Sequence, residues 1–125
     1  MRKKVLIVDD SPSVLAALKD ILDELGFAVT SASNGEEAYT QVENTKFNMI
    51  ITDLKMPIMD GIEFIERAKQ LSNCKFVPIV MLSSVDDEEK VASARKAGIS
   101  TFIKKPINEG KFTAMLNIVL GSSSS

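Results

Sequence analysis

Short unbroken runs of apolar residues recur along the chain, separated by longer stretches in which apolar residues are periodic. The clearest run is residues 5–8, which Asp9 and Asp10 close. An apolar run without alternation is typical of a strand that is buried on both faces. Further runs predict four more strands, at residues 27–29, 49–51, 79–82 and 102–103.

The stretch after the first run predicts an amphipathic helix. Its apolar residues fall on one face at helical spacing, and they are Val14, Leu15, Leu18, Ile21, Leu22 and Leu25. Ser11 is placed to cap the free N–H groups, and Pro12 suits the first helical position. Gly26 can adopt the left-handed conformation that ends a helix.

Sequence signals also mark later helices. Asn34 with Glu37, and Asp60 with Glu63, have the spacing of a capping box. Residues 86–89 are all acidic, which suits the first turn of a helix because the helix dipole favours negative charge there. The last helix has an apolar stripe, which consists of Phe112, Met115, Leu116 and Val119.

Strand and helix patterns alternate about five times over the 125 residues. Such alternation favours a five-stranded parallel sheet with helices on both faces, joined by right-handed crossovers. We therefore expect one doubly wound α/β domain over residues 1–120, because this length leaves no room for a second domain. Residues 121–125 are mostly serine, and we expect them to form a disordered tail. This tail is either a frayed end, a cloning remnant or the start of a truncated linker.

Composition and charge exclude several classes of protein. Apolar residues make up 45% of the chain and charged residues 26%, which is ordinary for a folded globular protein. The 15 basic and 17 acidic residues give a formal charge of -2, so no large positive field attracts nucleic acid directly. The sequence has no histidine, which excludes His-based metal sites and Ser/His/Asp catalysis.

The single cysteine and the N-terminal residues favour a cytoplasmic protein. Cys74 cannot form an internal disulfide and is expected to be a structural thiol. Only residues 5–8 separate the basic N-terminus from Asp9, which is too short for a signal-peptide core or a membrane span. We therefore expect neither export nor membrane insertion.

Polar side chains follow the predicted strands at their carboxyl ends. In a parallel sheet these ends lie at one edge, so residues after different strands converge. The converging groups are carboxylates, hydroxyls and amines, and they belong to Asp9, Asp10, Asp53, Ser83, Ser84, Lys104 and Lys105. Clustered carboxylates repel one another unless a cation or a lysine compensates their charge. Oxygen ligands without histidine or thiolate suit Mg²⁺, with Mn²⁺ as a second possibility.

This set of groups suits phosphoryl transfer. An ionised aspartate beside a divalent cation and a lysine can attack a phosphoryl group in line, because both cations stabilise charge on the equatorial oxygens. The product is an aspartyl phosphate. Ser83 can donate a hydrogen bond to a phosphoryl oxygen, although Ser83 or Ser84 could instead cap the following helix.

Taken in strand order, these residues resemble the receiver domain of two-component response regulators, with greatest likeness to the stand-alone, chemotaxis-type members. The resemblance runs from about residue 3 to residue 120, and it rests on Asp9-Asp10, Asp53-Leu54-Lys55-Met56-Pro57, Asp60-Gly61, Ser83 and Lys105-Pro106. It implies the flavodoxin-like strand order 2-1-3-4-5.

The resemblance also implies roles for the charged residues. Asp53 is expected to accept the phosphoryl group from a partner histidine kinase or phosphotransfer protein. Asp10, Asp53 and the backbone carbonyl of Lys55 are expected to bind Mg²⁺ directly, with Asp9 acting mainly through water. Lys105 is expected to pair with the acceptor carboxylate and then with the phosphoryl group.

A switch is implied as well. Ser83 is expected to be the switch hydroxyl, and Phe102 the aromatic residue whose rotamer follows it. Many receivers have tyrosine at the place of Phe102, so a hydroxyl hydrogen bond to an output partner is missing here. The movement would change a surface over about residues 86–112, which spans the fourth helix and fifth strand and controls an output protein.

Three further expectations concern the surroundings of the acceptor. The Lys105-Pro106 peptide bond is expected to be cis, which would aim the Lys105 amine back over the edge of the sheet. Lys55 is two places after the acceptor, and Val85 is two places after Ser83. Both are expected to lie where water approaches the phosphorylated site, and so to tune the lifetime of the aspartyl phosphate.

Three other functions are weaker alternatives to a phosphorylatable signalling switch. A small Mg²⁺-dependent phosphohydrolase would need a second acid two places after the nucleophile, where this chain has Lys55. A flavodoxin-like cofactor binder would need a phosphate-binding loop after the first strand and a tryptophan to stack the flavin. A pseudo-receiver would interact without phosphorylation, and it would not need the acceptor residues that this chain retains. We therefore do not expect a turnover enzyme.

Overall fold

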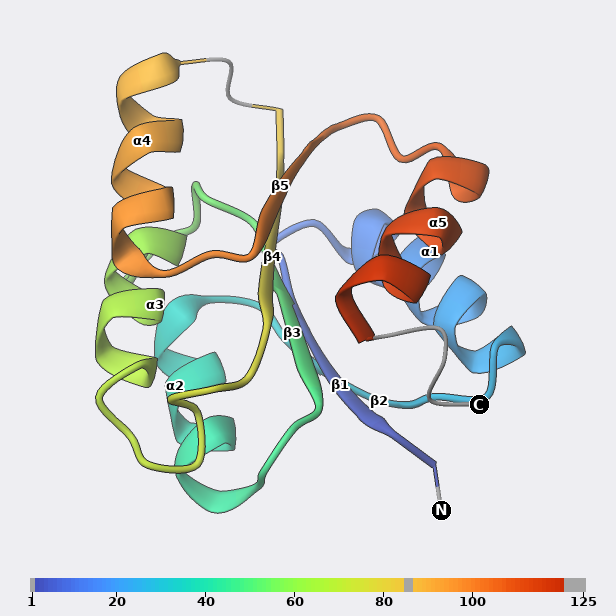
Figure 1. Cartoon of the computed structure of the whole chain (residues 1–125), viewed down its shortest axis with the longest axis horizontal. Helices are drawn as coiled ribbons and strands as arrows, with labels where there is room; N and C mark the ends of the chain where they lie inside the picture. The colour runs from blue at the N-terminus through green and yellow to red at the C-terminus, as the bar shows by residue number, and fades with distance from the viewer. Residues whose placement is uncertain (1, 85–86, 121–125) are drawn as a thin grey trace.

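The computed structural model describes residues 2–84 and 87–120, which form a five-stranded parallel sheet between two layers of helices (Figure 1). The strands are β1 (Lys4–Val8), β2 (Ala28–Ala32), β3 (Met49–Thr52), β4 (Ile79–Ser83) and β5 (Thr101–Lys104). The helices are α1 (Pro12–Glu24), α2 (Gly35–Asn44), α3 (Gly61–Ala68), α4 (Glu88–Ala97) and α5 (Glu109–Leu120). The strand order β2-β1-β3-β4-β5 confirms the predicted order and fold class.

Each face of the sheet has its own hydrophobic core. α1 and α5 cover one face, where Ile7, Leu22 and Phe112 are buried together. The other face is covered by α2, α3 and α4, and Leu6 and Phe64 are buried there (Figure 1). Successive strand residues point to opposite faces, so β1 has to be apolar at nearly every position.

The first helix begins and ends as the sequence predicts. The Ser11 hydroxyl accepts a hydrogen bond from the Val14 N–H at 3.4 Å, and Pro12 is the first helical residue. After the helix, Gly26 has a φ of 91°, in the left-handed region that residues with a side chain rarely adopt.

In each of the two predicted capping boxes, the N-cap side chain forms its expected hydrogen bond, but the glutamate three residues later does not bond back to the N-cap. The Asn34 and Asp60 side chains each accept the N–H of the residue three places later, at 2.8 and 2.9 Å. The returning carboxylates go elsewhere, because Glu37 accepts the Ser33 N–H at 2.9 Å and Glu63 pairs with Arg67 at 3.0 Å. Both N-caps are nevertheless in place.

The second strand is the element that the apolar pattern located least well. The pattern predicted residues 27–29, whereas β2 spans Ala28–Ala32 and includes the polar Thr30 and Ser31. β2 is an edge strand that pairs only with β1, so polar side chains are tolerated on it and no continuous apolar run is needed.

Some expectations fall on residues that are not described. Val85 and the tail at residues 121–125 lie outside the described residues, as does Asp86 at the start of the acidic run before α4. Within residues 2–84 and 87–120, no helix combines the length and the apolarity that crossing a bilayer requires.

Candidate functional site: an acidic cluster at the carboxyl edge of the sheet

The topology brings acids from two parts of the chain to one edge of the sheet. Asp9 and Asp10 follow β1, and Asp53 follows β3, which is the neighbour of β1 in the sheet. The Asp53 N–H donates to the carbonyl of Val8 at 2.8 Å, which continues the ladder one step beyond the strand. The convergence predicted from parallel strands is therefore present.

Asp9 is 2% exposed, and both of its carboxylate oxygens have partners. Oδ1 accepts the N–H of Ser11 at 2.9 Å, and Oδ2 accepts the ammonium of Lys105 at 2.8 Å. The first of these bonds ties the carboxylate to the start of α1. The second ties it to the residue that follows β5.

Asp53 is 8% exposed and is held in a similar way. Its Oδ1 accepts the N–H of Leu54 at 2.7 Å, and its Oδ2 lies 3.3 Å from the Lys105 ammonium. Lys105 therefore bridges Asp9 and Asp53, with Asp9 as its nearer partner. The sequence pointed only to the pairing of Lys105 with Asp53.

Opposing electrostatic effects act on Asp53 and Lys105. Burial raises the pKa of Asp53, and the neighbouring charge of Asp9 raises it further, against the lowering effects of the Leu54 N–H and the Lys105 ammonium. Burial alone would lower the pKa of Lys105, but the hydrogen bond that Lys105 donates to Asp9 and the charges of Asp53 and Asp9 raise this pKa above its ordinary value. Lys105 is therefore a firmly charged group between two crowded acids.

The acids also satisfy the requirements of a hard cation. Asp9, Asp10 and Asp53 each offer one carboxylate oxygen, and these oxygens lie within 4.8 Å of one another. Asp10 is exposed, so a cation can reach this set from solvent. A cluster of oxygen ligands without nitrogen or sulfur fits Mg²⁺.

The hydroxyl and aromatic residues named from the sequence lie on the neighbouring strands. Ser83 is the last residue of β4 and is 1% exposed, and its carbonyl accepts the N–H of Lys105 at 3.0 Å. Ser84 is exposed. Phe102 lies on β5 and is paired with Met81 of β4. It is partly buried and packs against the core between the sheet and the helices α2, α3 and α4.

The segment after Asp53 is fixed mainly by its backbone. Lys55 is exposed, and the N–H of Gly61 donates to the carbonyl of Leu54 at 2.8 Å. The Met59 N–H donates to the carbonyl of Pro57 at 2.7 Å, which closes a tight turn around Ile58 with its φ of 72°. On the other side of the site, the Lys105-Pro106 peptide bond is cis.

Two contacts that hold Asp53 were not predicted from the sequence. The buried hydroxyl of Thr52 donates to the Asp53 carbonyl at 2.9 Å. Gly61 packs so tightly against the same carbonyl that no side chain fits. The Asp60-Gly61 pair was part of the recognised motif, but the physical need for a glycine appears only when the loop folds back.

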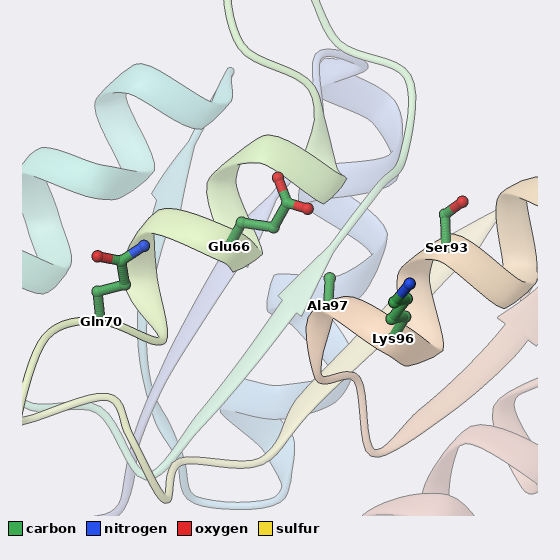
Figure 2. Close-up of a pocket in the computed structure, with 5 residues that line it drawn as sticks. All are labelled: Glu66, Gln70, Ser93, Lys96 and Ala97. Atoms are coloured by element: carbon green, nitrogen blue, oxygen red, sulfur yellow. The ribbon is translucent and has the colours of Figure 1, made fainter.

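A hollow of about 600 Å³ lies elsewhere, between α3 and α4 (Figure 2). Glu66 lines it from α3 and Gln70 from the turn after that helix, and Ser93, Lys96 and Ala97 line it from α4. Figure 2 shows these side chains spread along α3, the turn after it and α4 without converging on a common point. Convergent polar groups are what a small-molecule site requires, so the acidic edge is the better candidate for chemistry.

Comparison with known proteins agrees with this geometry. Residues 5–117 match the response regulator receiver domain. The chemotaxis protein CheY1 of Helicobacter pylori is 33% identical over 122 residues, which are 96% of this chain and 98% of that protein. The alkaline phosphatase synthesis transcriptional regulatory protein PhoP of Bacillus subtilis is 35% identical over 124 residues, which are 98% of this chain and 50% of that protein.

Solved structures give the same result. The chemotaxis response regulator CheY4 of Vibrio cholerae has a TM-score of 0.90 and 34% identity, covering 96% of this chain and 100% of that one. The receiver domain of a Pseudomonas aeruginosa sensor histidine kinase, at 23% identity, shares the fold with a TM-score of 0.90, covering 97% and 99%. This chain therefore belongs to the response regulator receiver domain family.

Proposed function

We propose that Asp53 accepts a phosphoryl group from a phosphohistidine on a partner kinase or phosphotransfer protein. A carboxylate oxygen of Asp53 attacks phosphorus in line. The new P–O bond forms as the P–N bond breaks, and the electron pair leaves on the imidazole nitrogen. The chain acts once per phosphoryl group, as a switch, and its own hydrolysis of the aspartyl phosphate resets it.

The observation that carries this proposal is the position of the Lys105 ammonium, 2.8 Å from Asp9 and 3.3 Å from Asp53. In the free protein the ammonium offsets two crowded carboxylates. When Asp53 is phosphorylated, the same ammonium can pair with a phosphoryl oxygen, because it already lies beside the acceptor. No histidine or second nucleophile is required within the chain.

Mg²⁺ is the cofactor that the acids suit. Asp10, Asp53 and the Lys55 backbone carbonyl would hold it directly, and Asp9, which is the nearer partner of the Lys105 ammonium, would act mainly through water. A bound Mg²⁺ would neutralise charge on the transferring oxygens. The same oxygen ligands accept Mn²⁺. In the Pseudomonas aeruginosa receiver of the same fold, a magnesium ion is coordinated in the active site cleft.

The signal would leave the site through Ser83 and Phe102. Ser83 moves toward the phosphoryl oxygens, and Phe102 rotates into the space that this movement opens. α4 is suited to respond, because Ala94 is its single buried residue and little apolar surface holds it in place. The output surface then comprises α4, β5 and α5, and Lys55 and Val85 set the lifetime of the aspartyl phosphate.

The proposed reaction implies two classes of partner. The donor is a histidine kinase or a phosphotransfer protein, and the output partner is a protein. The named relatives include chemotaxis proteins and a transcriptional regulator, so the family alone does not select between these outputs. Cys74 is a free, buried thiol, in keeping with action in the reducing cytoplasm.

Intact-mass measurement tests the proposal. Purified chain is incubated with Mg²⁺ and acetyl phosphate, and one added phosphoryl group is expected. The addition should be lost in Asp53→Asn and kept in Asp60→Asn, because Asp60 only caps α3 and asparagine also caps helices. No mass change in the wild type would support a pseudo-receiver, whereas release of phosphate from many substrate molecules would support a phosphohydrolase.

A further inference from the structure

The amino-terminal edge of the sheet, opposite the acidic cluster, carries an unusual exposed aromatic residue. Phe76 lies between α3 and β4, and 89% of it is exposed to solvent. The segment that carries it lies at the end of the molecule where β4 begins (Figure 1). Nothing in the proposed phosphorylation reaction uses this residue.

Side-chain hydrogen bonds tie the segment around Phe76 to the rest of the fold. The Asn73 side-chain amide donates to the carbonyl of Val42 at 2.8 Å, which ties the segment to the end of α2. The half-buried Lys69 ammonium donates to the carbonyls of Val77 at 2.9 Å and Lys75 at 3.4 Å. A partner that contacts Phe76 therefore loses little conformational freedom in the loop.

Phe76 flanks a hollow of about 200 Å³ that both polar and apolar residues line. Asn48, Ser72 and Asn73 contribute side chains that can form hydrogen bonds, and Pro78 contributes apolar surface. Asn48 is fixed in turn, because its side-chain oxygen accepts the Lys4 N–H at 2.7 Å. The hollow is the size of one apolar side chain with flanking backbone rather than of a cofactor.

The charge around the hollow is positive. Residues 2–4, 45–48 and 70–78 contain five basic residues and no acidic residue. Lys46 lines the hollow, and the Lys75 ammonium lies 5.8 Å from the centre of the Phe76 ring. Neither lysine has an ion-pair partner within the described residues. The nearest acid before the hollow in sequence is Glu43, in α2.

The geometry points to a docking site for an acidic peptide segment of a partner protein. One apolar side chain of that segment enters the hollow against Phe76, and carboxylates on either side pair with Lys46 and Lys75. An aromatic anchor with Lys46 and Lys75 beside it is complementary to such a segment. Because the hollow lies at the sheet edge opposite Asp53, docking here leaves the acceptor free.

An anionic membrane is a poorer fit to the same residues. The formal charge of the whole chain is -2, which opposes approach to an anionic surface. A single aromatic side chain beside a hollow offers little area for insertion between lipids, whereas the hydrogen-bonding side chains of Asn48, Ser72 and Asn73 suit a peptide backbone.

Titration with a synthetic peptide tests the inference. The probe is a fluorescein-labelled peptide of alternating glutamate and serine around one central leucine. Saturable binding is expected by fluorescence anisotropy, with NMR amide shifts confined to residues 45–48 and 72–78. Phe76→Ala, and separately the pair Lys46→Glu with Lys75→Glu, should each raise Kd about tenfold or more. Raised salt should weaken binding.

Matched variants and probes make the result decisive. Ile118→Ala is the control for Phe76→Ala, because it removes an apolar side chain that is 81% exposed on α5. Lys90→Glu is the control for the lysine substitutions, because it makes the same change of charge on α4. Both variants should bind the peptide with the wild-type Kd. Asp53→Asn should also bind normally, so loss of phosphorylation and loss of docking are separate outcomes. The inference is overturned if the peptide does not bind saturably, or if Phe76→Ala binds it as tightly as the wild type does. It is also overturned if a control peptide with lysine in place of each glutamate binds equally well. Phe76-dependent binding to phosphatidylglycerol vesicles, without binding to the peptide, would overturn it as well.

Discussion

Gly61 lies so close to Asp53 that a Cβ atom on Gly61 would collide with the Asp53 backbone carbonyl oxygen. The contact joins the first residue of α3 to the proposed acceptor, and the hydrogen bond from the Gly61 N–H to the Leu54 carbonyl at 2.8 Å reinforces it. The position of the Asp53 backbone therefore depends on the absence of a side chain eight residues later.

Gly61→Ala is expected to displace the acceptor segment. Backbone must move to accommodate the methyl group, because the obstructing atom is a carbonyl oxygen rather than the end of a flexible side chain. We expect a loss of about 1–3 kcal/mol in the free energy of unfolding, as in other overpacked sites. Phosphorylation by acetyl phosphate, measured by intact mass, should also be slowed strongly.

Gly26→Ala is the control for this substitution. Gly26 has a φ of 91°, and nothing lies within 4 Å of a Cβ atom placed there. Alanine therefore causes backbone strain of about 1–2 kcal/mol but no collision. Phosphorylation at the wild-type rate in Gly26→Ala, together with slowed phosphorylation in Gly61→Ala, would separate the local contact from general destabilisation. Equal rates in both variants would contradict the role given to Gly61.

The sequence predicted the strands well where burial on both faces of the sheet requires apolar residues. β1, β3 and β4 are covered on both faces, so their runs had to be apolar and were found. β2 lies at an edge and tolerates Thr30 and Ser31, so its apolar run marked only part of it. The capping residues were found because N-cap chemistry is local, but the partners of Glu37 and Glu63 depend on the neighbouring side chains Ser33 and Arg67.

Lys105→Met is expected to destabilise the free protein by at least about 2 kcal/mol, because it leaves Asp9 and Asp53 crowded and uncompensated. The Lys105 side chain is only 18% exposed, so solvent cannot replace the ammonium fully. Urea denaturation in EDTA measures the change. Lys19→Met is the control, since the Lys19–Asp23 pair is exposed and its loss should cost less than about 1 kcal/mol. Similar losses in both variants would show that the buried position of Lys105 is unimportant.

Mg²⁺ is expected to stabilise the chain through Asp10. Binding to the folded state alone contributes about 1.4 kcal/mol at a Mg²⁺ concentration of ten times Kd, which appears as a rise in Tm. Asp10→Asn should abolish most of this rise, because it removes one of three clustered carboxylates. Asp20→Asn, on an exposed position of α1, should keep it. A full Mg²⁺-dependent rise in Asp10→Asn would exclude Asp10 as a ligand.

The members of the candidate site could be named from the sequence, because parallel topology alone brings strand ends together. The pairing of Lys105 with Asp53 was also predicted, but its shorter contact with Asp9 was not. Whether Lys105 lies nearer Asp9 or Asp53 depends on differences of tenths of an ångström between side chains, and the apolar pattern carries no such information. The Thr52 hydroxyl was missed for a related reason, since a strand threonine usually indicates β-propensity rather than a hydrogen bond to the next carbonyl.

Asp53→Asn is expected to stabilise the metal-free protein at pH 7, because burial and the charge of Asp9 disfavour the ionised carboxylate. The pKa of Asp53 is raised in the folded state, so this unfavourable contribution is present above the folded pKa and disappears as pH falls toward the unfolded value of 3.8. The Tm difference between variant and wild type, followed in EDTA from pH 7 downward, should therefore shrink.

Glu37→Gln is expected to change Tm at pH 7 in the opposite direction to Asp53→Asn. Hydrogen bonds from the Ser33 N–H and hydroxyl lower the pKa of Glu37, so its carboxylate stabilises the fold above the unfolded value of 4.5 and loses that effect as pH falls. Glu37→Gln should melt below wild type at pH 7, and Asp53→Asn above it, with both differences narrowing in acid. A lower Tm for Asp53→Asn at pH 7 would mean that the bonds from Leu54 and Lys105 outweigh burial at the acceptor.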